Sequence, residues 1–168
     1  NEKYLPGAKL PKRLKATCEI GEAVGNADVV IMGIPSQNFR AVLKEVREHI
    51  RAWVPVISLT KGLELDTGMR MTEIIQQELP GHPFGVLTGP NLAREIMAGQ
   101  AAASVIAMED EIIVQELQKV FNSGLFRVYT NTDVVGCELG GVLKNIIAIA
   151  VGMGDGQGAG DNTRAALI

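Results

Sequence analysis

Cysteine is scarce in this sequence, and so is any long run of one charge. Its 168 residues include two cysteines, Cys18 and Cys137, which are too few and too far apart for a disulfide framework or a zinc site. The net charge of −3 comes from interspersed acidic and basic residues, which excludes the basic footprint of a nucleic-acid-binding domain. The N-terminus is basic but has no apolar segment of the kind found in secretory signals. These absences favour a reduced, cytoplasmic protein without a metal centre.

A glycine-rich phosphate-binding turn is also missing. The pattern G-x-G-x-x-G, which follows a strand and opens a helix in dinucleotide-binding domains, occurs nowhere in the chain. The nearest glycine cluster, GMGDGQGAG from Gly152 onward, follows a predicted helix instead of a strand. We therefore expect this cluster to form a loop.

The sequence does contain a regular alternation of apolar segments and amphipathic segments up to about residue 132. The apolar segments, which predict buried strands, cover residues 27–35, 55–60, 84–88, 101–108 and 126–131, with a further short strand at 17–20. The amphipathic segments, which predict helices, cover residues 37–50, 67–79, 92–98 and 110–121, with a short helix or turn at 21–26. Helical connections between strands predict right-handed crossovers and a mostly parallel sheet. The fold class is therefore α/β, followed after residue 132 by all-helical sequence.

The last predicted helix, residues 134–153, carries an unusual lysine. Glu138 and Lys144 are the only formal charges between Gly136 and Gly154, and the sequence IIAIAV begins two residues after Lys144. This context predicts that the lysine head group is drawn into apolar surroundings. Lys144 and Asn145 also interrupt the apolar run, which leaves it too short to span a membrane.

Two interpretations of Lys144 remain open at this point. The lysine either extends to the helix edge or pairs with Glu138, although a spacing of six residues is unfavourable for a pair on one helix. Alternatively, it is a desolvated group that exchanges a proton or holds an anion.

Three of the predicted strands end in residues suited to a ligand site. Ser36 follows the first of them, Lys61 and Gly62 follow the second, and Gly89 and Asn91 follow the third. Ligands of open parallel sheets bind beyond the carboxyl ends of the strands. We expect the two glycines to admit a ligand close to the backbone, and Asn91 to open a helix whose amides favour an anion.

Lys61 is either an ordinary surface lysine or a cation at the mouth of the sheet. If it faces the same cleft as Lys144, the two ammonium groups attract an anionic substrate. Such a pair suits the reduction of a carbonyl, in which negative charge develops on oxygen and a proton must follow.

Several motifs together resemble one enzyme family. They are SLTKG at residues 58–62, GPNLAREI at 89–96, FRVYTNTDVVGCELGGVLKNIIAIAVGMGDG at 126–156 and GDNTRAALI at 160–168, supported by YLPG near the start and ADVVIMGIPSQ from residue 27. In this order they resemble bacterial NAD(P)-dependent glycerol-3-phosphate dehydrogenase. The resemblance implies a Rossmann-like sheet, with residues 1–132 as a partial dinucleotide-binding domain and residues 133–168 as the start of a helical substrate domain.

The resemblance also implies roles for individual residues. Lys144 matches the lysine that exchanges a proton with the substrate hydroxyl, and Asn145 is its companion in the site. Lys61 matches a lysine that touches both substrate and cofactor. Gly89 and Asn91 match substrate-contacting positions, although many bacterial members carry serine where this chain has Asn91. Another matched position, Ala93, lies beside the dinucleotide.

The implied reaction is the interconversion of dihydroxyacetone phosphate and sn-glycerol 3-phosphate with NAD or NADP, which supplies the backbone of phospholipids. We expect a homo-oligomer that binds a phosphorylated triose or glycerol and neither nucleic acid nor a membrane. The family's first strand, glycine turn and first helix are expected before Asn1, and a later aspartate and an Arg-Asn pair after Ile168. The isolated 168 residues should then bind cofactor weakly and tend to associate.

Two alternatives remain open at the level of sequence. One is another two-domain dehydrogenase that acts on a sugar acid or a nucleotide sugar. The other is a non-catalytic binding or assembly fragment of such an enzyme.

Overall fold

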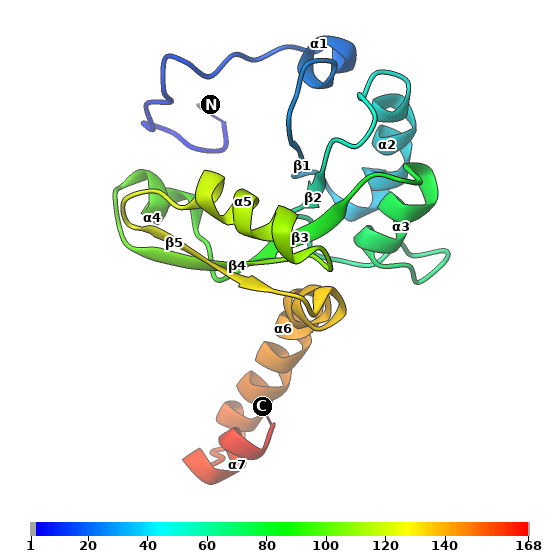
Figure 1. Cartoon of the computed structure of the whole chain (residues 1–168). Helices are drawn as coiled ribbons and strands as arrows, with labels where there is room; N and C mark the ends of the chain where they lie inside the picture. The colour runs from blue at the N-terminus through cyan, green and yellow to red at the C-terminus, as the bar shows by residue number, and fades with distance from the viewer. Residues whose placement is uncertain (1–2, 168) are drawn as a thin grey trace.

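The computed structural model describes residues 3–167 and contains one five-stranded sheet (Figure 1). Asn1, Glu2 and Ile168, at the outer ends of the two predicted domains, lie outside the described residues. Neighbouring strands in the sheet follow the order of the sequence, and three of the four strand pairs are parallel. The prediction of a mostly parallel α/β sheet is therefore confirmed. The strands are β1 (Val30–Met32), β2 (Val56–Ser58), β3 (Phe84–Thr88), β4 (Ala102–Ala107) and β5 (Phe126–Asn131).

Helices cover both faces of the sheet. Val56 and Ile57 are adjacent in β2 and so point to opposite faces, where each joins a different hydrophobic cluster. The cluster with Val56 includes residues of α1, α2 and α3, whereas the cluster with Ile57 includes residues of α5. The helices are α1 (Ile20–Val24), α2 (Phe39–Arg47, preceded by the 3-10 turn η1 at Ser36–Asn38), α3 (Met71–Glu78), α4 (Ala93–Met97), α5 (Glu111–Phe121), α6 (Val134–Gly156) and α7 (Asp161–Leu167).

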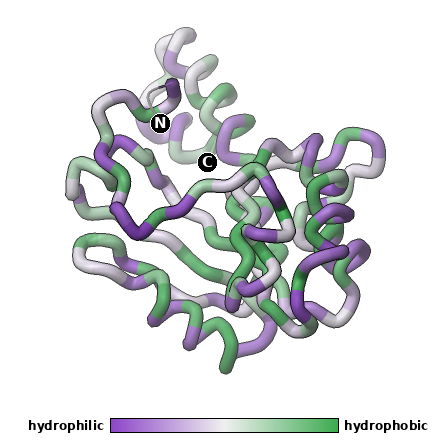
Figure 2. Tube along the Cα trace, turned by 90° about the horizontal axis from the view of Figure 1, so that it is seen from above, coloured by the Kyte–Doolittle hydropathy of each residue, from purple (hydrophilic) through white to green (hydrophobic). Residues whose placement is uncertain are grey.

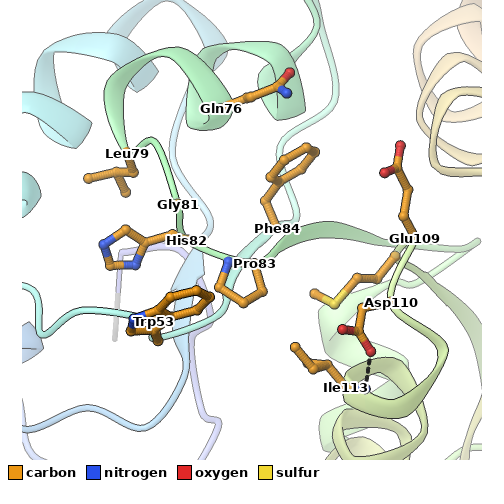
Figure 3. Close-up of a pocket in the computed structure, with 11 residues that line it drawn as sticks. Trp53, Gln76, Leu79, Gly81, His82, Pro83, Phe84, Glu109, Asp110 and Ile113 are labelled. Atoms are coloured by element: carbon orange, nitrogen blue, oxygen red, sulfur yellow. Dashed lines mark hydrogen bonds between the residues drawn. The ribbon is translucent and has the colours of Figure 1, made fainter.

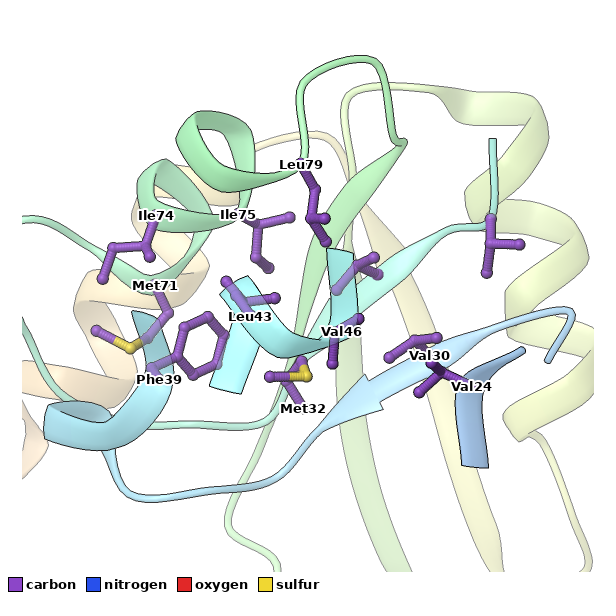
Figure 4. Close-up of a cluster of buried hydrophobic side chains, with 12 residues drawn as sticks. Val24, Val30, Met32, Phe39, Leu43, Val46, Met71, Ile74, Ile75 and Leu79 are labelled. Carbon is purple, nitrogen blue, oxygen red and sulfur yellow. The ribbon is translucent and has the colours of Figure 1, made fainter. Parts of the chain in front are cut away.

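The larger cluster lies between α2 and α3 (Figure 4). Phe39 and Leu43 of α2 are completely buried and point toward Met71 and Ile75 of α3. These α2 positions are four residues apart, as expected for the apolar side of an amphipathic helix. Figure 2 shows the mainly hydrophobic strands in the middle of the molecule and the mixed polarity of the surrounding helices.

An ion-pair network joins the same two helices at their surface. Arg40 of α2 donates to both carboxylate oxygens of Glu64 at 2.8 Å and to Glu78 of α3 at 2.6 Å. The hydrogen bonds from Arg40 lower the pKa of Glu64 to about 2, with a smaller contribution from Thr67. Hydrogen bonds to Glu64 and then to Glu78 raise the pKa of Arg40. The network therefore adds ion pairs to the apolar contact between α2 and α3.

Several predicted boundaries and surfaces are wrong. No strand forms at 17–20, because Thr17 donates to Glu22 and accepts from the amide of Glu19, which leads into α1 instead. Helix α3 begins at Met71 and not near Thr67, because residues 63 and 70 form an isolated antiparallel bridge first. On β1, Ile31 is 48% exposed, so that strand is covered on one face only.

The pattern of residues 110–121 predicts that Ile113, Leu117, Val120 and Phe121 face inward, and Val120 does not. Val120 is 70% exposed, whereas Val114 and Leu117 are buried against β4 and β5. The helix begins as predicted at Asp110, whose carboxylate accepts from the amides of Ile112 and Ile113.

Strands β4 and β5 run opposite to β1, β2 and β3 in the described chain. Strand β4 pairs with β3 in an antiparallel register, with Thr88 opposite Val105. Parallel neighbours need a crossover connection of about a dozen or more residues, usually a helix. The connection between β3 and β4 contains only the five-residue helix α4, and the chain reverses direction across it.

Helix α6 packs on the sheet only at its beginning and then extends away from it (Figure 1). Val134 and Glu138 are its buried residues, and Val134 contacts Val86 and Ala107. The helix continues to Gly156, so the first half of the glycine cluster predicted as a loop is helical. By length and hydropathy α6 could cross a membrane, but a single such helix is weak evidence, and Lys144 interrupts its middle.

Candidate functional site

The carboxyl ends of β1, β2 and β3 meet at one edge of the sheet. Thr60, just after β2, donates its hydroxyl to the carbonyl of Ile34 at 2.7 Å and so joins the two loops. Gly62 has a φ of +143°, and a Cβ there would lie 2.8 Å from the Ser36 hydroxyl. Glycine is therefore required at position 62 by contact between two protein segments, which is a different reason from the ligand approach predicted above.

Lys61 lies at this edge with an exposed side chain. Its ammonium donates to the carbonyl of Gly89, after β3, at 3.1 Å. An ammonium has three donors, so one is used to bridge the ends of β2 and β3 and two remain for other acceptors. The bridge fixes the head group of Lys61 over the edge where a ligand of a parallel sheet binds.

Helix α6 passes directly over Lys61. A Cβ on Gly141 would lie 3.0 Å from the Thr88 hydroxyl and 3.7 Å from both Cγ and Cε of Lys61. Lys144 follows Gly141 by three residues and so lies on the same side of the helix. Because helical side chains lean toward the N-terminus of the helix, that of Lys144 leans back toward Gly141 and Lys61. The helix register thus places Lys144 one turn beyond the contact between Gly141 and Lys61.

Lys144 differs from the prediction in its environment. Its side chain is exposed, as is that of Asn145, and neither is drawn into apolar surroundings. The apolar residues that follow it lie on a part of α6 that no other described element covers apart from α7. Among the described residues, Lys144 is therefore exposed to solvent and not desolvated. The alternative pair with Glu138 is also wrong, because Glu138 has other partners.

Gly89 and Asn91 are held against β4. A Cβ on Gly89 would lie 2.7 Å from the carbonyl of Ala103 and 2.8 Å from the Ser104 hydroxyl, so close strand packing requires the glycine. Asn91 donates through Nδ2 to the same hydroxyl of Ser104. Its Oδ1 is buried and has no hydrogen-bond partner among the described residues. This carbonyl oxygen is an acceptor that a hydroxyl-bearing ligand could satisfy.

The helix after Asn91 is weaker than predicted. Helix α4 has five residues and no side-chain cap, and the amide of Asn91 already donates to Gly89. The anion site at its start therefore has one amide fewer than predicted, and it stays a prediction. Ala93 is the first residue of α4, two residues after Asn91, and it is exposed.

A buried carboxylate that the sequence analysis did not assign to the site lies next to this edge. Glu138 of α6 accepts from the amide and the hydroxyl of Thr72 and from Arg70 at 3.1 Å. Close by, burial raises the pKa of the Cys137 thiol, and the Asp133 carboxylate adds a smaller effect in the same direction. The sequence signal for Glu138 was an acidic residue in an otherwise apolar helix, but its partners lie 66 and 68 residues away.

A pocket lies at the other end of the strands (Figure 3). Its volume is about 380 Å³, and it lies between Trp53, His82 and Pro83 on one side and Glu109 and Asp110 on the other. It opens where β2 and β3 begin, and none of the predicted site residues lines it. A smaller hollow of about 170 Å³ is lined by Thr88, Gly89 and Ser104 and borders the lysine edge.

Comparison with known proteins agrees with this arrangement. Residues 1–114 match the family described as NAD-dependent glycerol-3-phosphate dehydrogenase N-terminus, and residues 133–168 match the corresponding C-terminus. The chain belongs to the NAD-dependent glycerol-3-phosphate dehydrogenase family. The first match covers β1 to β4 and includes Lys61, and the second begins at residue 133, just before α6.

Individual glycerol-3-phosphate dehydrogenases are similar along the whole chain. The protein from Sphingopyxis alaskensis is 73% identical over 168 residues, and one from Mycobacterium tuberculosis is 53% identical over 169 residues. The crystal structure of the Coxiella burnetii enzyme has a TM-score of 0.87 and 35% identity over 99% of this chain. The chain spans about half the length of these curated relatives, and 51% of the Coxiella chain.

Proposed function

We propose that this chain forms the lysine-bearing part of a catalytic site that interconverts dihydroxyacetone phosphate and sn-glycerol 3-phosphate with NAD or NADP. The supporting observation is the contact of Lys61 with Gly141, one helical turn before Lys144. Two ammonium groups at one edge attract a dianionic phosphorylated triose and stabilise negative charge on its carbonyl oxygen.

Each residue has a distinct role in the proposed site. Lys144 donates a proton to the substrate oxygen on reduction and removes it on oxidation, and Asn145 beside it orients the substrate. Lys61, held by the Gly89 carbonyl, faces both substrate and dinucleotide. Asn91 offers its unpaired Oδ1 to a substrate hydroxyl. Gly89, which has no side chain, allows the backbone beside Asn91 to pack closely on β4.

The cofactor would lie along the same edge of the sheet. Lys61 and Ala93 are exposed, and the ends of β1, β2 and β3 are formed of small or polar residues that suit a dinucleotide. When bound, its nicotinamide supplies the hydride that Lys144 complements with a proton. In this proposal residues 1–132 belong to the dinucleotide-binding domain and residues 133–168 begin the substrate domain. We further propose a cytoplasmic homo-oligomer that serves phospholipid synthesis.

Substitution of Lys144 tests the proposal. In the whole protein that the gene encodes, Lys144→Met should lower kcat for dihydroxyacetone phosphate by about 10²- to 10⁴-fold, because proton transfer from a positioned group contributes that much. Titration followed by NADH fluorescence should give a cofactor Kd within about twofold of the unmodified protein. The matched control is Lys119→Met on α5, since that lysine is exposed and pairs only with Glu116 among the described contacts.

Three results would contradict parts of the proposal. Full turnover by the Lys144→Met protein would remove this lysine from the proton transfer. Turnover of a sugar acid or nucleotide sugar, with none for dihydroxyacetone phosphate, would favour another two-domain dehydrogenase. Failure of the unmodified protein to bind NADH would favour a non-catalytic fragment.

A further inference from the structure

Glu138 is the last buried residue of α6 before the helix leaves the sheet. Its exposed fraction is 3%, whereas every later residue of α6 is partly or fully exposed. It lies in the same helix as Lys144 but six residues earlier, too far around the helix to touch it. We propose that Glu138 is a positioning residue that fixes the rotation of α6 and thereby places Lys144 over Lys61, an inference that rests on the proposed function.

The contacts of Glu138 hold its carboxylate in one orientation. One oxygen accepts from the backbone amide of Thr72 at 3.1 Å. The other accepts from the Thr72 hydroxyl at 2.5 Å and from Arg70 at 3.1 Å. Since both oxygens have fixed donors, the carboxylate cannot turn without losing a hydrogen bond, and the helix that carries it cannot rotate freely.

These donors belong to the first turn of α3, whose amides need acceptors from outside the helix. Arg70 occupies the N-cap position and has no side-chain acceptor to offer. Glu73 accepts from the Arg70 amide at 2.8 Å, so it satisfies one donor from within the helix. Glu138 satisfies the Thr72 amide from α6, and its negative charge is favourable at the positive end of α3. Glu138 of α6 therefore caps the N-terminus of α3 and joins the two helices.

The register along α6 connects this cap to the lysines. Gly141, three residues after Glu138, meets Lys61 and Thr88, and Lys144 comes three residues after that. Each residue turns the helix by about 100°, so the angle of Lys144 about the helix axis follows from that of Glu138. Beyond Gly141 the sheet no longer supports α6, so its angle is defined by the packing of Val134 at its start, the hydrogen bonds of Glu138 and the close contact at Gly141.

The test uses Glu138→Gln in the whole protein that the gene encodes. Glutamine keeps the length of the side chain but replaces one carboxylate oxygen with an NH2 group. This NH2 group would face the donors of Thr72 or Arg70, so at least one hydrogen bond is lost. We expect kcat for dihydroxyacetone phosphate to fall at least tenfold and KM for NADH to change less than twofold. The matched control is Glu73→Gln, which removes a second carboxylate from Arg70 and α3 without touching α6. Its kcat should stay within twofold.

A double-mutant cycle separates positioning from a general structural role. In a Lys144→Met background, Glu138→Gln should lower the residual kcat by less than twofold, because the group that it positions is gone. An equal loss in both backgrounds would overturn the inference. If Glu138→Gln does not fold, Thr72→Val removes one donor to Glu138 and keeps the shape of the side chain. That variant should show a smaller loss of kcat that also disappears in the Lys144→Met background.

A cross-linking measurement reads the same geometry without relying on activity. Lys61→Cys and Lys144→Cys are introduced into a Cys18→Ser, Cys137→Ala protein, and a short bifunctional maleimide joins the two thiols. Glu138→Gln should slow this cross-link at least fivefold, and Glu73→Gln should not. Unchanged cross-linking would overturn the inference. Failure of the unmodified protein to reduce dihydroxyacetone phosphate, with slowed cross-linking in Glu138→Gln, would instead overturn only the proposed function.

Discussion

The adjacent glycines 140 and 141 of α6 have different surroundings. A Cβ on Gly140 would meet nothing within 4 Å, whereas one on Gly141 would lie 3.0 Å from the Thr88 hydroxyl. Alanine in an exposed helix interior is about 1 kcal/mol more favourable than glycine. We therefore expect Gly140→Ala to raise the free energy of unfolding by up to about 1 kcal/mol, and Gly141→Ala to give less or none.

Urea unfolding of the two variants measures this difference, and each serves as the control for the other. Equal stabilisation by both alanines would contradict the close contact between α6 and the end of β3. Gly141→Val would sharpen the result, because a branched side chain must displace Lys61 or tilt the helix.

Single residues were the hardest part to predict from sequence. The resemblance selected Lys61 and Lys144 from many lysines, but the predicted burial of Lys144 depended on its apolar neighbours along the chain. Those neighbours are themselves exposed on the outer part of α6, so they do not surround Lys144 in the structure. Glu138 has the environment that was expected for Lys144, because Arg70 and Thr72 come from a distant part of the chain.

At the scale of elements, the network of Arg40, Glu64 and Glu78 makes the joint between α2 and α3 sensitive to acid. The pKa of Glu64 is about 2 in the folded chain, below its ordinary value of 4.5. A depressed carboxyl pKa stabilises the fold above the ordinary value, and that contribution is lost as the pH falls from about 4.5 toward about 2. We expect the free energy of unfolding to decrease across this range.

Urea unfolding at several acidic pH values checks this expectation. Arg40→Met should lower stability at neutral pH and flatten the acid dependence, since Glu64 loses the donor that lowers its pKa. Arg51→Met is the control, because Arg51 pairs with the exposed Asp28 and should change the pH dependence little. An unaltered slope in the Arg40→Met protein would contradict the assigned cause.

Elements with a clear period were predicted well, and their connections were not. The segments Phe84–Thr88 and Phe126–Asn131 match the predicted strands in full, because apolar runs bounded by turn residues define both ends. The reversal of β4 could not be read from its residues, since an apolar strand looks the same in either direction. The connection that precedes it contains only the five-residue α4, within the helix predicted at residues 92–98.

At the scale of the whole molecule, the outer half of α6 presents an apolar stripe. Ile146, Ile149 and Met153 lie three and four residues apart and are 63%, 64% and 65% exposed. Exposed apolar stripes of this kind favour association, since each buried side chain contributes about 1.5 to 3 kcal/mol. We expect the 168-residue chain to self-associate as its concentration rises.

Sedimentation velocity across a range of concentrations measures the association. The pair Ile146→Lys and Ile149→Lys should weaken it at least tenfold, because two charges would enter an apolar contact. Val120→Lys on α5 is the control, since Val120 is equally exposed but isolated from the stripe. A monomeric chain at all concentrations would contradict this expectation.

Trp53 is the only tryptophan in the chain, and it borders the pocket at the end of the sheet opposite the lysines. Indole emission therefore comes from one place, whose solvent contact changes when the turn before β3 loosens. Quenching of that emission by iodide would report the opening of this turn. In the same sample, the absorbance of NADH would report the reaction proposed at the lysine edge. The two ends of one sheet can thus be observed independently in a single cuvette.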